Sequence, residues 1–372
     1  MTLSPIVALP RRAHAGFSLI EIMVGLVIAM LAIIVVLQVF SVFETRKRVV
    51  SNGGDAQTNG TLAFQQLQRD ISQAGYAFSA TSIFNCAARW TLPSGASIAS
   101  AVRLAPVTIN PGTAVIPAGD ANTDTMLVAY GATNGQPQGN TISAQAGAVY
   151  TIQMPTSFTV KDRVIAAPAA CAADLLLDEI STVSASTVTV KTGSAGAVLY
   201  NLGPAPVILA YAIRGGNLTV CDYLQNDCGL AANKGNAAIW APVASNIVSM
   251  KALYWRDTAA PDMDGIPDAN GHDQTTPSNG CGWARIPAIG LALVARSGEY
   301  NKDVVTGTAR NAPAPVNAPS WTENAGAPLV AASGSLGPDL AADEPWKHYR
   351  YKVLEAVIPI RNVAWMGAVP GC

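Results

Sequence analysis

The sequence predicts an α+β protein in which a long N-terminal helix packs on an antiparallel β-sheet with elaborated loops. Three observations lead to this prediction. An uncharged apolar run covers residues 22–43, an amphipathic stretch follows it, and from residue 83 onward the apolar residues change from a helical period to a period of two. The chain of 372 residues therefore has a helical N-terminal part and a β-rich remainder.

The apolar run from Ile22 to Phe43 has 22 residues and no charge. At a rise of about 1.5 Å per residue, a helix of this length covers about 33 Å, which is enough to cross the hydrocarbon core of a bilayer. Glu21 is the ionisable residue at the start of the run. A carboxylate in hydrocarbon costs at least about 2.5 kcal/mol, so its presence indicates a function that involves a positively charged partner.

The residues before the run have the layout of a processing signal. Arg11 and Arg12 form a short basic leader, and the small residues Ala15 and Gly16 precede the apolar run. An ordinary secretory signal has its small residues after the apolar part, so that cleavage removes both. Cleavage here would keep the hydrophobic helix. The order Gly-Phe-Ser-Leu-Ile-Glu at residues 16–21 resembles the N-terminal motif of type IV prepilins.

This resemblance implies that a prepilin peptidase cuts between Gly16 and Phe17 and methylates the new amine of Phe17. Glu21 would pair with the amino terminus of a neighbouring subunit in a filament, because two buried opposite charges offset each other's desolvation. Major pilins commonly have a proline where this chain has Gln38, which favours a minor pilin or a pseudopilin. The alternatives are a plain single-span anchor with a chance glutamate and, less favoured, a twin-arginine export signal.

The prepilin resemblance implies four parts of the chain. They are a leader peptide at 1–16, a transmembrane or filament-core helix at 17–43, an amphipathic continuation at 44–80, and a β-rich globular pilin domain at 81–372. The protein would cross the inner membrane once, with the globular domain in the periplasm, and would then enter the pilus. The basic residues at 46–48 favour the opposite orientation, but the motif and the cysteines outweigh them.

All cysteines follow the membrane run, and their even number in an exported region predicts disulfides in an oxidising compartment. The six candidates are Cys86, Cys171, Cys221, Cys228, Cys281 and Cys372. Six cysteines allow about 15 pairings, and only Cys221–Cys228 suggests itself, as a short clip across a turn. Unpaired structural thiols are the alternative.

Residues 51–54, Ser-Asn-Gly-Gly, are predicted to interrupt the helix, because each glycine costs about 1 kcal/mol relative to alanine. This junction could act as a hinge. A second helical stretch follows, ending near Gly75, and its apolar stripe is expected to pack on the globular part. The stripe consists of Phe64, Leu67, Ile71, Ala74 and Phe78.

Runs rich in Val, Ile, Thr and Tyr predict the strands of the domain. They lie at residues 125–130, 148–154, 157–165, 186–191, 206–213, 218–223, 247–255, 288–297 and 349–361, with a shorter candidate at 175–177. The glycine turn at 214–217 predicts a hairpin. Residues 311–345 are rich in Pro, Ala, Gly and Asn and are expected to form a long surface loop.

Several later patches resemble the PilW type of minor pilin. They are residues 63–76, 253–255 with the Asp-Gly loop that follows, 291–297 and 349–362. The resemblance thus extends in patches from Gly16 to Asn362, and the order of the patches strengthens it.

No motif argues for an enzyme. The three histidines, His14, His272 and His348, come without a Gly-x-Ser-x-Gly elbow, a phosphate-binding loop or a zinc-ligand spacing. The net charge is −1 and only 13% of residues are charged, so no basic surface for nucleic acid is expected. We therefore expect neither catalysis nor nucleic-acid binding.

One loop is a candidate Ca²⁺ site. Asp262, Asp264 and Asp268 surround Gly265, and hard oxygen ligands close together suit this ion. Pro267 limits the backbone, and a solvated acidic turn is the alternative, because the same residue types form turns. No other cofactor is expected.

The tryptophans are expected to differ in their roles. Trp240, Trp255, Trp283 and Trp346 are expected to fill the core of the sheet rather than to form a ligand-binding face. Trp321 lies in the predicted surface loop and is the candidate for a partner contact.

The family resemblance implies a minor pilin that helps to initiate a type IV pilus and lies at its tip, with roles in adhesion and twitching motility. Its partners would be the prepilin peptidase, other minor pilins and the major pilin, the inner-membrane assembly platform and a tip adhesin. Two alternatives remain, a type II secretion pseudopilin and a membrane-tethered exported binding protein or hydrolase.

Overall fold

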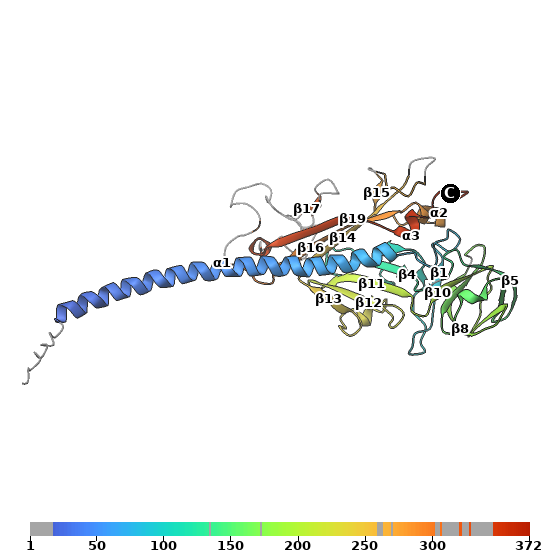
Figure 1. Cartoon of the computed structure of the whole chain (residues 1–372), viewed down its shortest axis with the longest axis horizontal. Coiled ribbons are helices and arrows are strands. Elements are labelled where there is room, and N and C mark those ends of the chain that lie inside the picture. The colour runs from blue at the N-terminus through green and yellow to red at the C-terminus, as the bar shows by residue number, and fades with distance from the viewer. Residues whose placement is uncertain are drawn as a thin grey trace, which may run out of the picture. The chain divides into compact units, whose positions relative to one another are not determined.

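The computed structural model divides the chain into two compact units, Met1–Ser51 and Asn52–Cys372. Figure 1 shows the elements of both units. The structure describes residues 18–133, 135–171, 173–258, 263–268, 271–301, 306, 320–321, 327–328 and 345–372.

Helix α1 runs from Leu19 to Gln73 without a break and contributes to both units. The predicted interruption at residues 51–54 is therefore wrong. Two glycines cost the helix only about 2 kcal/mol, and helix formation is cooperative, so an apolar segment on one side and a packed segment on the other carry the helix through them. The boundary between the two compact units nevertheless falls beside these glycines.

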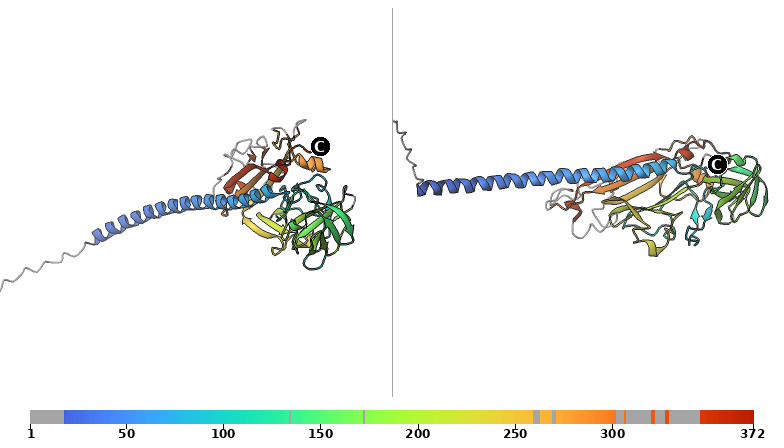
Figure 2. Two further views of the ribbon diagram at one scale, coloured as in Figure 1. Left: turned by 45° about the vertical axis from the view of Figure 1, so that its right-hand side comes forward. Right: turned by 60° about the horizontal axis from the view of Figure 1, so that its bottom comes forward.

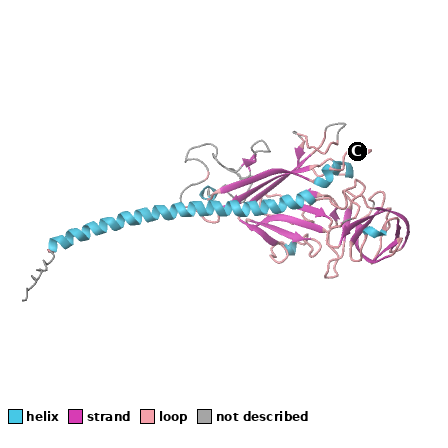
Figure 3. Cartoon of the chain, in the orientation of Figure 1, coloured by secondary structure: helices cyan, strands magenta, loops and turns pink. Residues whose placement is uncertain are grey.

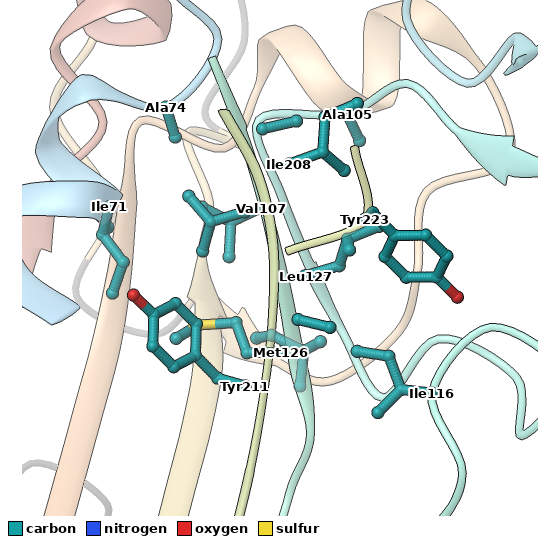
Figure 4. Close-up of a cluster of buried hydrophobic side chains, with 14 of the residues drawn as sticks. Ile71, Ala74, Ala105, Val107, Ile116, Met126, Leu127, Ile208, Tyr211 and Tyr223 are labelled. Carbon is teal, nitrogen blue, oxygen red and sulfur yellow. The ribbon is translucent and has the colours of Figure 1, made fainter. Parts of the chain in front are cut away.

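The C-terminal part of α1 belongs to the second unit and packs on its strands, as the apolar stripe predicted. Leu67, Ile71 and Ala74 are fully buried, and Figure 4 shows the last two against side chains of the neighbouring strands. Gly60 allows close approach, since a Cβ there would lie 2.6 Å from Leu354. Gly75 follows the helix with φ +78°, the left-handed conformation expected of a helix end.

Two sheets pack near this part of the helix (Figure 3). The five-stranded sheet has the order β13-β12-β11-β4-β3, and the four-stranded sheet has the order β15-β14-β16-β19. Their strands are β3 (Val107–Ile109), β4 (Met126–Tyr130), β11 (Val207–Arg214), β12 (Asn217–Asp222), β13 (Ala241–Ser245), β14 (Ile247–Trp255), β15 (His272–Asp273), β16 (Ala288–Arg296) and β19 (Tyr351–Pro359).

Buried polar groups join the two sheets. The Asp124 carboxylate, shortly before β4, accepts a hydrogen bond from the Ala252 N–H of β14. The Tyr254 hydroxyl of β14 accepts one from the Ile109 N–H of β3 at 2.7 Å. These buried bonds fix the sheets against each other, because breaking one would leave a buried group unpaired.

The remaining long strands form a barrel, which the prediction of one antiparallel sheet did not include. An eight-stranded sheet has the order β2-β1-β8-β7-β10-β5-β6-β9, and the pairing of β8 with β9 closes six of its strands into a ring. The strands are β1 (Ala87–Arg89), β2 (Val102–Arg103), β5 (Asn140–Ala146), β6 (Val149–Ile152), β7 (Arg163–Ala167), β8 (Leu175–Val183), β9 (Thr187–Val190) and β10 (Val198–Gly203). The pairing of β1 with β8 is parallel.

The barrel is an insertion between β4 and β11, which pair directly with each other. The chain leaves and returns at one place, where the Ala132 N–H donates to the Leu202 carbonyl at 2.7 Å. Gly203, at φ +83°, is needed there, because a Cβ would lie 2.2 Å from the Ala132 oxygen. The barrel has its own apolar core, and Figure 2 shows its green strands at the end of the unit where α1 ends.

Most predicted strands are present, but two differ from the prediction. Residues 157–165 are not one strand. They begin in the short helix η1 (Pro155–Ser157) and pass through a turn, in which the Asp162 carboxylate accepts from the Thr159 N–H, before β7 starts. The candidate at 175–177 extends to Val183.

The predicted surface loop at 311–345 lies largely outside the described residues. Within it, β17 (Ser320–Trp321) pairs with β18 (Ala327–Pro328). Trp321 is only 3% exposed and packs on the four-stranded sheet with Val248 and Val294. The assignment of Trp321 to a partner contact is therefore wrong, because the sheet itself buries this side chain. Trp240, Trp283 and Trp346 are buried as expected, and Trp255 is partly buried.

Short helices complete the described elements. They are η2 (Ala231–Asn233), α2 (Gly280–Ala284), η4 (Pro345–His348) and α3 (Arg361–Ala364).

Candidate assembly helix and processing site

The N-terminal segment of α1 has no buried side. Residues Leu19–Glu44 form a helix long and apolar enough to cross a membrane, and none of its most apolar window is buried within the protein. Even the least exposed of its large apolar side chains, Val39, is 49% exposed. A helix that is apolar all round needs an apolar environment on every side, so its partner, lipid or protein, lies outside this segment.

Glu21 lies in the first turn of α1. The helix begins after Ser18, whose carbonyl accepts the N–H groups of Glu21 and Ile22 at 3.0 and 3.2 Å. Within the described part of the chain the Glu21 carboxylate, which is exposed, has no ion-pair partner. A carboxylate in this turn is favoured by the helix dipole, and it remains available to a positive group from elsewhere.

The predicted cleavage residues, Gly16 and Phe17, lie outside the described residues, so the structure does not test the cleavage. Their sequence context can be compared with known families. Residues 11–37 match the prokaryotic N-terminal methylation motif. No curated protein and no solved structure matches the chain.

The methylation motif covers the end of the leader with its two arginines, the predicted cleavage point, Glu21 and most of the apolar segment. It indicates a type IV pilin-like protein, a pilin or a pseudopilin, that is processed by a prepilin peptidase and works with the components of a pilus or secretion system. Together with the exposed apolar helix it indicates a membrane-anchored, pilus-associated protein with a large β-rich C-terminal domain.

A buried carboxylate on the second half of α1 was not among the predicted site residues. Asp70 is 0% exposed, and it accepts hydrogen bonds from the hydroxyls of Tyr130 on β4 and Tyr211 on β11. Burial, and then the charge of Asp70, raise the pKa of both tyrosines, that of Tyr130 to about 12. Both phenols therefore stay protonated and act as donors to the carboxylate. The local sign of its burial was its spacing, three residues after Leu67 and four before Ala74, which places Asp70 on the buried stripe.

The six cysteines form three disulfides, Cys86–Cys171, Cys221–Cys228 and Cys281–Cys372. The short clip suggested by the spacing is the second of these. The other two join residues more than 80 positions apart, and no local pattern could have paired them. Cys86–Cys171 ties the barrel strands to the segment after α1, and Cys281–Cys372 fastens the C-terminus.

The candidate Ca²⁺ loop is only partly described, because Asp262 lies outside the described residues. Asp264 accepts the Ile266 N–H, and Asp268 accepts the N–H and hydroxyl of Thr258. Burial first, and then Asp264 and Asp268, raise the pKa of the nearby Asp257. Over the described residues no group of three or more His, Cys, Asp or Glu side chains is placed to hold a metal. Calcium binding stays a prediction.

Two of the three histidines lie in aromatic stacks. The His272 ring stacks on Trp255 at 5.1 Å, and the His348 ring stacks on Tyr300 at 4.6 Å. His14 lies outside the described residues. Both rings thus pack against a neighbouring aromatic side chain. The expectation that the chain is not an enzyme stays a prediction.

Proposed function

We propose that this chain is a minor pilin of a type IV pilus, of the PilW type, that helps to initiate assembly and lies at the tip. The observation that carries the proposal is the methylation motif at residues 11–37, followed by a helix whose large apolar side chains are exposed from Leu19 to Phe43. The prepilin peptidase cuts between Gly16 and Phe17 and methylates Phe17. We propose no enzymatic activity for the chain itself.

Two features of the N-terminal helix explain how the subunit would assemble, its exposed apolar side chains and its Glu21. Each exposed Leu, Ile and Val side chain is stabilised by about 1.5–3 kcal/mol when it leaves water. Lipid provides this environment in the membrane, and the helices of neighbouring subunits replace the lipid in a filament. Glu21 needs a positive partner in that apolar environment, and the amine of Phe17 from a neighbour supplies it. Because an unpaired buried charge costs several kcal/mol, this pair sets the stagger of adjacent subunits.

The size of the second unit supports a position at the tip. It carries two sheets and an inserted barrel, and such a domain is difficult to repeat at every lattice position of a shaft. At the tip it would contact other minor pilins, the major pilin below and a tip adhesin, after delivery by the inner-membrane assembly platform. Immunogold labelling spread evenly along pili would contradict this position.

Mass spectrometry of the mature N-terminus tests the processing. The protein from wild-type cells is expected to begin at N-methylated Phe17, whereas protein from cells without the prepilin peptidase should begin at Met1. A mature chain that starts at Met1 in wild-type cells would refute the proposal.

A type II secretion pseudopilin is the second candidate, because Gln38 stands where major pilins commonly have proline. Deleting the gene distinguishes the two. Loss of twitching with intact protein secretion supports the pilus, and the reverse result supports the secretion system. A membrane-tethered binding protein or hydrolase, in contrast, should keep its function when Glu21 is replaced by alanine.

We also retain Ca²⁺ binding at Asp262, Asp264 and Asp268 as a proposal. Oxygen ligands at this spacing suit Ca²⁺. Isothermal titration of the full-length protein in detergent with CaCl₂ should give saturable heat. Absence of binding heat at millimolar calcium would refute Ca²⁺ binding at this loop.

A further inference from the structure

A pocket of about 320 Å³ lies where the turn of the β11–β12 hairpin faces the segment after η2. Arg214, Asn217 and Thr219 line it from the hairpin, and Lys234, Asn236 and Trp240 line it from the other side. None of the lining residues is acidic. The volume is that of a site for a small molecule, and all its walls belong to the second unit.

The cationic wall of the pocket is held in place. The Arg214 guanidinium lies 4.2 Å from the centre of the Trp240 ring, and its two terminal nitrogens donate to the carbonyls of Ala118 and Pro117. Asp120 is the acidic group that faces Arg214, but its carboxylate oxygens accept the N–H groups that follow, those of Gly215 and Gly216. The guanidinium is thus fixed without a direct ion pair.

The unmatched polar groups of the lining residues are donors. Arg214 Nε and Trp240 Nε1 are buried and have no hydrogen-bond partner. Lys234 is exposed, and its ammonium has no ion-pair partner in the described part of the unit. Arg214 Nε and Trp240 Nε1 are both out of reach of solvent, so the groups that a ligand can contact are the Lys234 ammonium and the terminal nitrogens of Arg214. These groups favour a ligand that brings acceptors over one that brings donors.

We propose that this pocket binds a small ligand through an oxyanion, a carboxylate or a phosphate group, held by Arg214 and Lys234. A guanidinium fixed by stacking is suited to such groups, and charge-assisted hydrogen bonds to them are about twice as strong as neutral ones. The proposal goes beyond a role in assembly and does not depend on it, because it uses only residues of the second unit.

Binding is tested with the full-length protein in detergent by isothermal titration with three probes. Inorganic phosphate and D-glucuronate carry the two oxyanions, and D-glucose is the neutral control. We expect saturable binding of at least one anion and none of glucose, with an affinity that falls as NaCl is added. Glucuronate alone would assign a carboxylate ligand and phosphate alone a phosphate ligand. Binding of neither, or of glucose equally well, would overturn the proposal.

Two substitutions locate the site. Lys234→Gln removes an exposed charge without disturbing the core and should weaken binding about tenfold, the loss expected for one charge-assisted hydrogen bond. Trp240→Phe keeps an aromatic ring beside the Arg214 guanidinium, and it should weaken binding less. Lys161→Gln, at an exposed lysine of the barrel, is the matched control and should leave binding unchanged. Equal weakening by the two lysine variants would mean diffuse charge attraction and would refute the pocket.

Discussion

The two halves of α1 belong to one uninterrupted helix but have opposite surfaces. From Leu19 to Phe43 every large apolar side chain is about half exposed or more. From Asp55 to Ala74 one stripe is fully buried, and the opposite side, including Asp55 and Leu62, is exposed. The first half lacks a partner within its unit, whereas the second half is covered by sheets of its own unit.

This difference shows where each half finds its stabilisation. Apolar burial contributes roughly in proportion to the area removed from water, so the second half is stabilised by folding and the first only by lipid or another chain. The two carboxylates differ in the same way. Asp70 accepts hydrogen bonds inside the protein, whereas Glu21 has no ion-pair partner within the described part of the chain. Substitutions on the two halves should therefore affect different properties.

The largest effect is expected at Glu21. Glu21→Ala should abolish incorporation into pili, because the amine of a neighbouring subunit would lose its counter-charge, while membrane insertion and folding stay intact. Glu44→Ala, at the far end of the same apolar segment, is the matched control and should assemble normally. The measurement is the amount of this protein in sheared pili compared with the membrane fraction. Normal assembly of the Glu21→Ala variant would show that filament formation does not require the Glu21 carboxylate.

Asp70→Ala should destabilise the folded protein by about 3–5 kcal/mol, because the hydroxyls of the buried Tyr211 and the partly buried Tyr130 lose their acceptor. Asp55→Ala, on the exposed side of the same helix, should change stability by less than about 0.5 kcal/mol. Chemical unfolding of the full-length protein in detergent, followed by tryptophan fluorescence, measures both. Similar values for the two variants would show that the hydrogen bonds from Tyr130 and Tyr211 to Asp70 do not hold the helix on the sheet.

Leu67→Ala and Leu62→Ala compare a buried and an exposed leucine one and a half turns apart. Leu67 is 0% exposed, and its truncation should cost about 2–5 kcal/mol through lost burial and a cavity. Leu62 is 59% exposed, and its truncation should cost less than about 0.5 kcal/mol. The same unfolding experiment applies. If Leu62→Ala instead reduced assembly without changing stability, its surface would be a contact between subunits.

The smallest effect is expected at the junction of the two halves. A Cβ at Gly54 would have open space around it, so Gly54→Ala should favour the helix by about 1 kcal/mol. Hydrogen exchange of the surrounding amides should slow accordingly. Assembly that stays normal in this variant would count against a hinge at residues 51–54, and reduced assembly would support one.

Local signals in the sequence were sufficient for several elements. The period of Leu67, Ile71 and Ala74 predicted the packed side of α1, and Gly75 predicted its end. The turn at 214–217 predicted the β11–β12 hairpin, because the residues that pair there are close in the sequence. Each of these features depends on neighbours a few positions away.

The interruption of the helix was predicted wrongly because the intrinsic helix propensity of single residues makes only a small contribution to helix stability. The glycines at 53–54 lower helix stability, but the flanking segments extend the helix on both sides and outweigh them. The assignment of Trp321 failed for a related reason. Its sequence neighbours are polar and small, and the apolar face that buries it belongs to β14 and β16.

The sequence by itself determined the processing motif, the apolar helix with its lone Glu21, and most of the longer strands, although not β5, β10 or β13, because each is encoded within a short window of residues. Only the tertiary structure decided the closure of the barrel between β4 and β11, the two long disulfides and the partners of Asp70. These depend on contacts between residues far apart in the chain, which form when burial of apolar surface brings whole segments together.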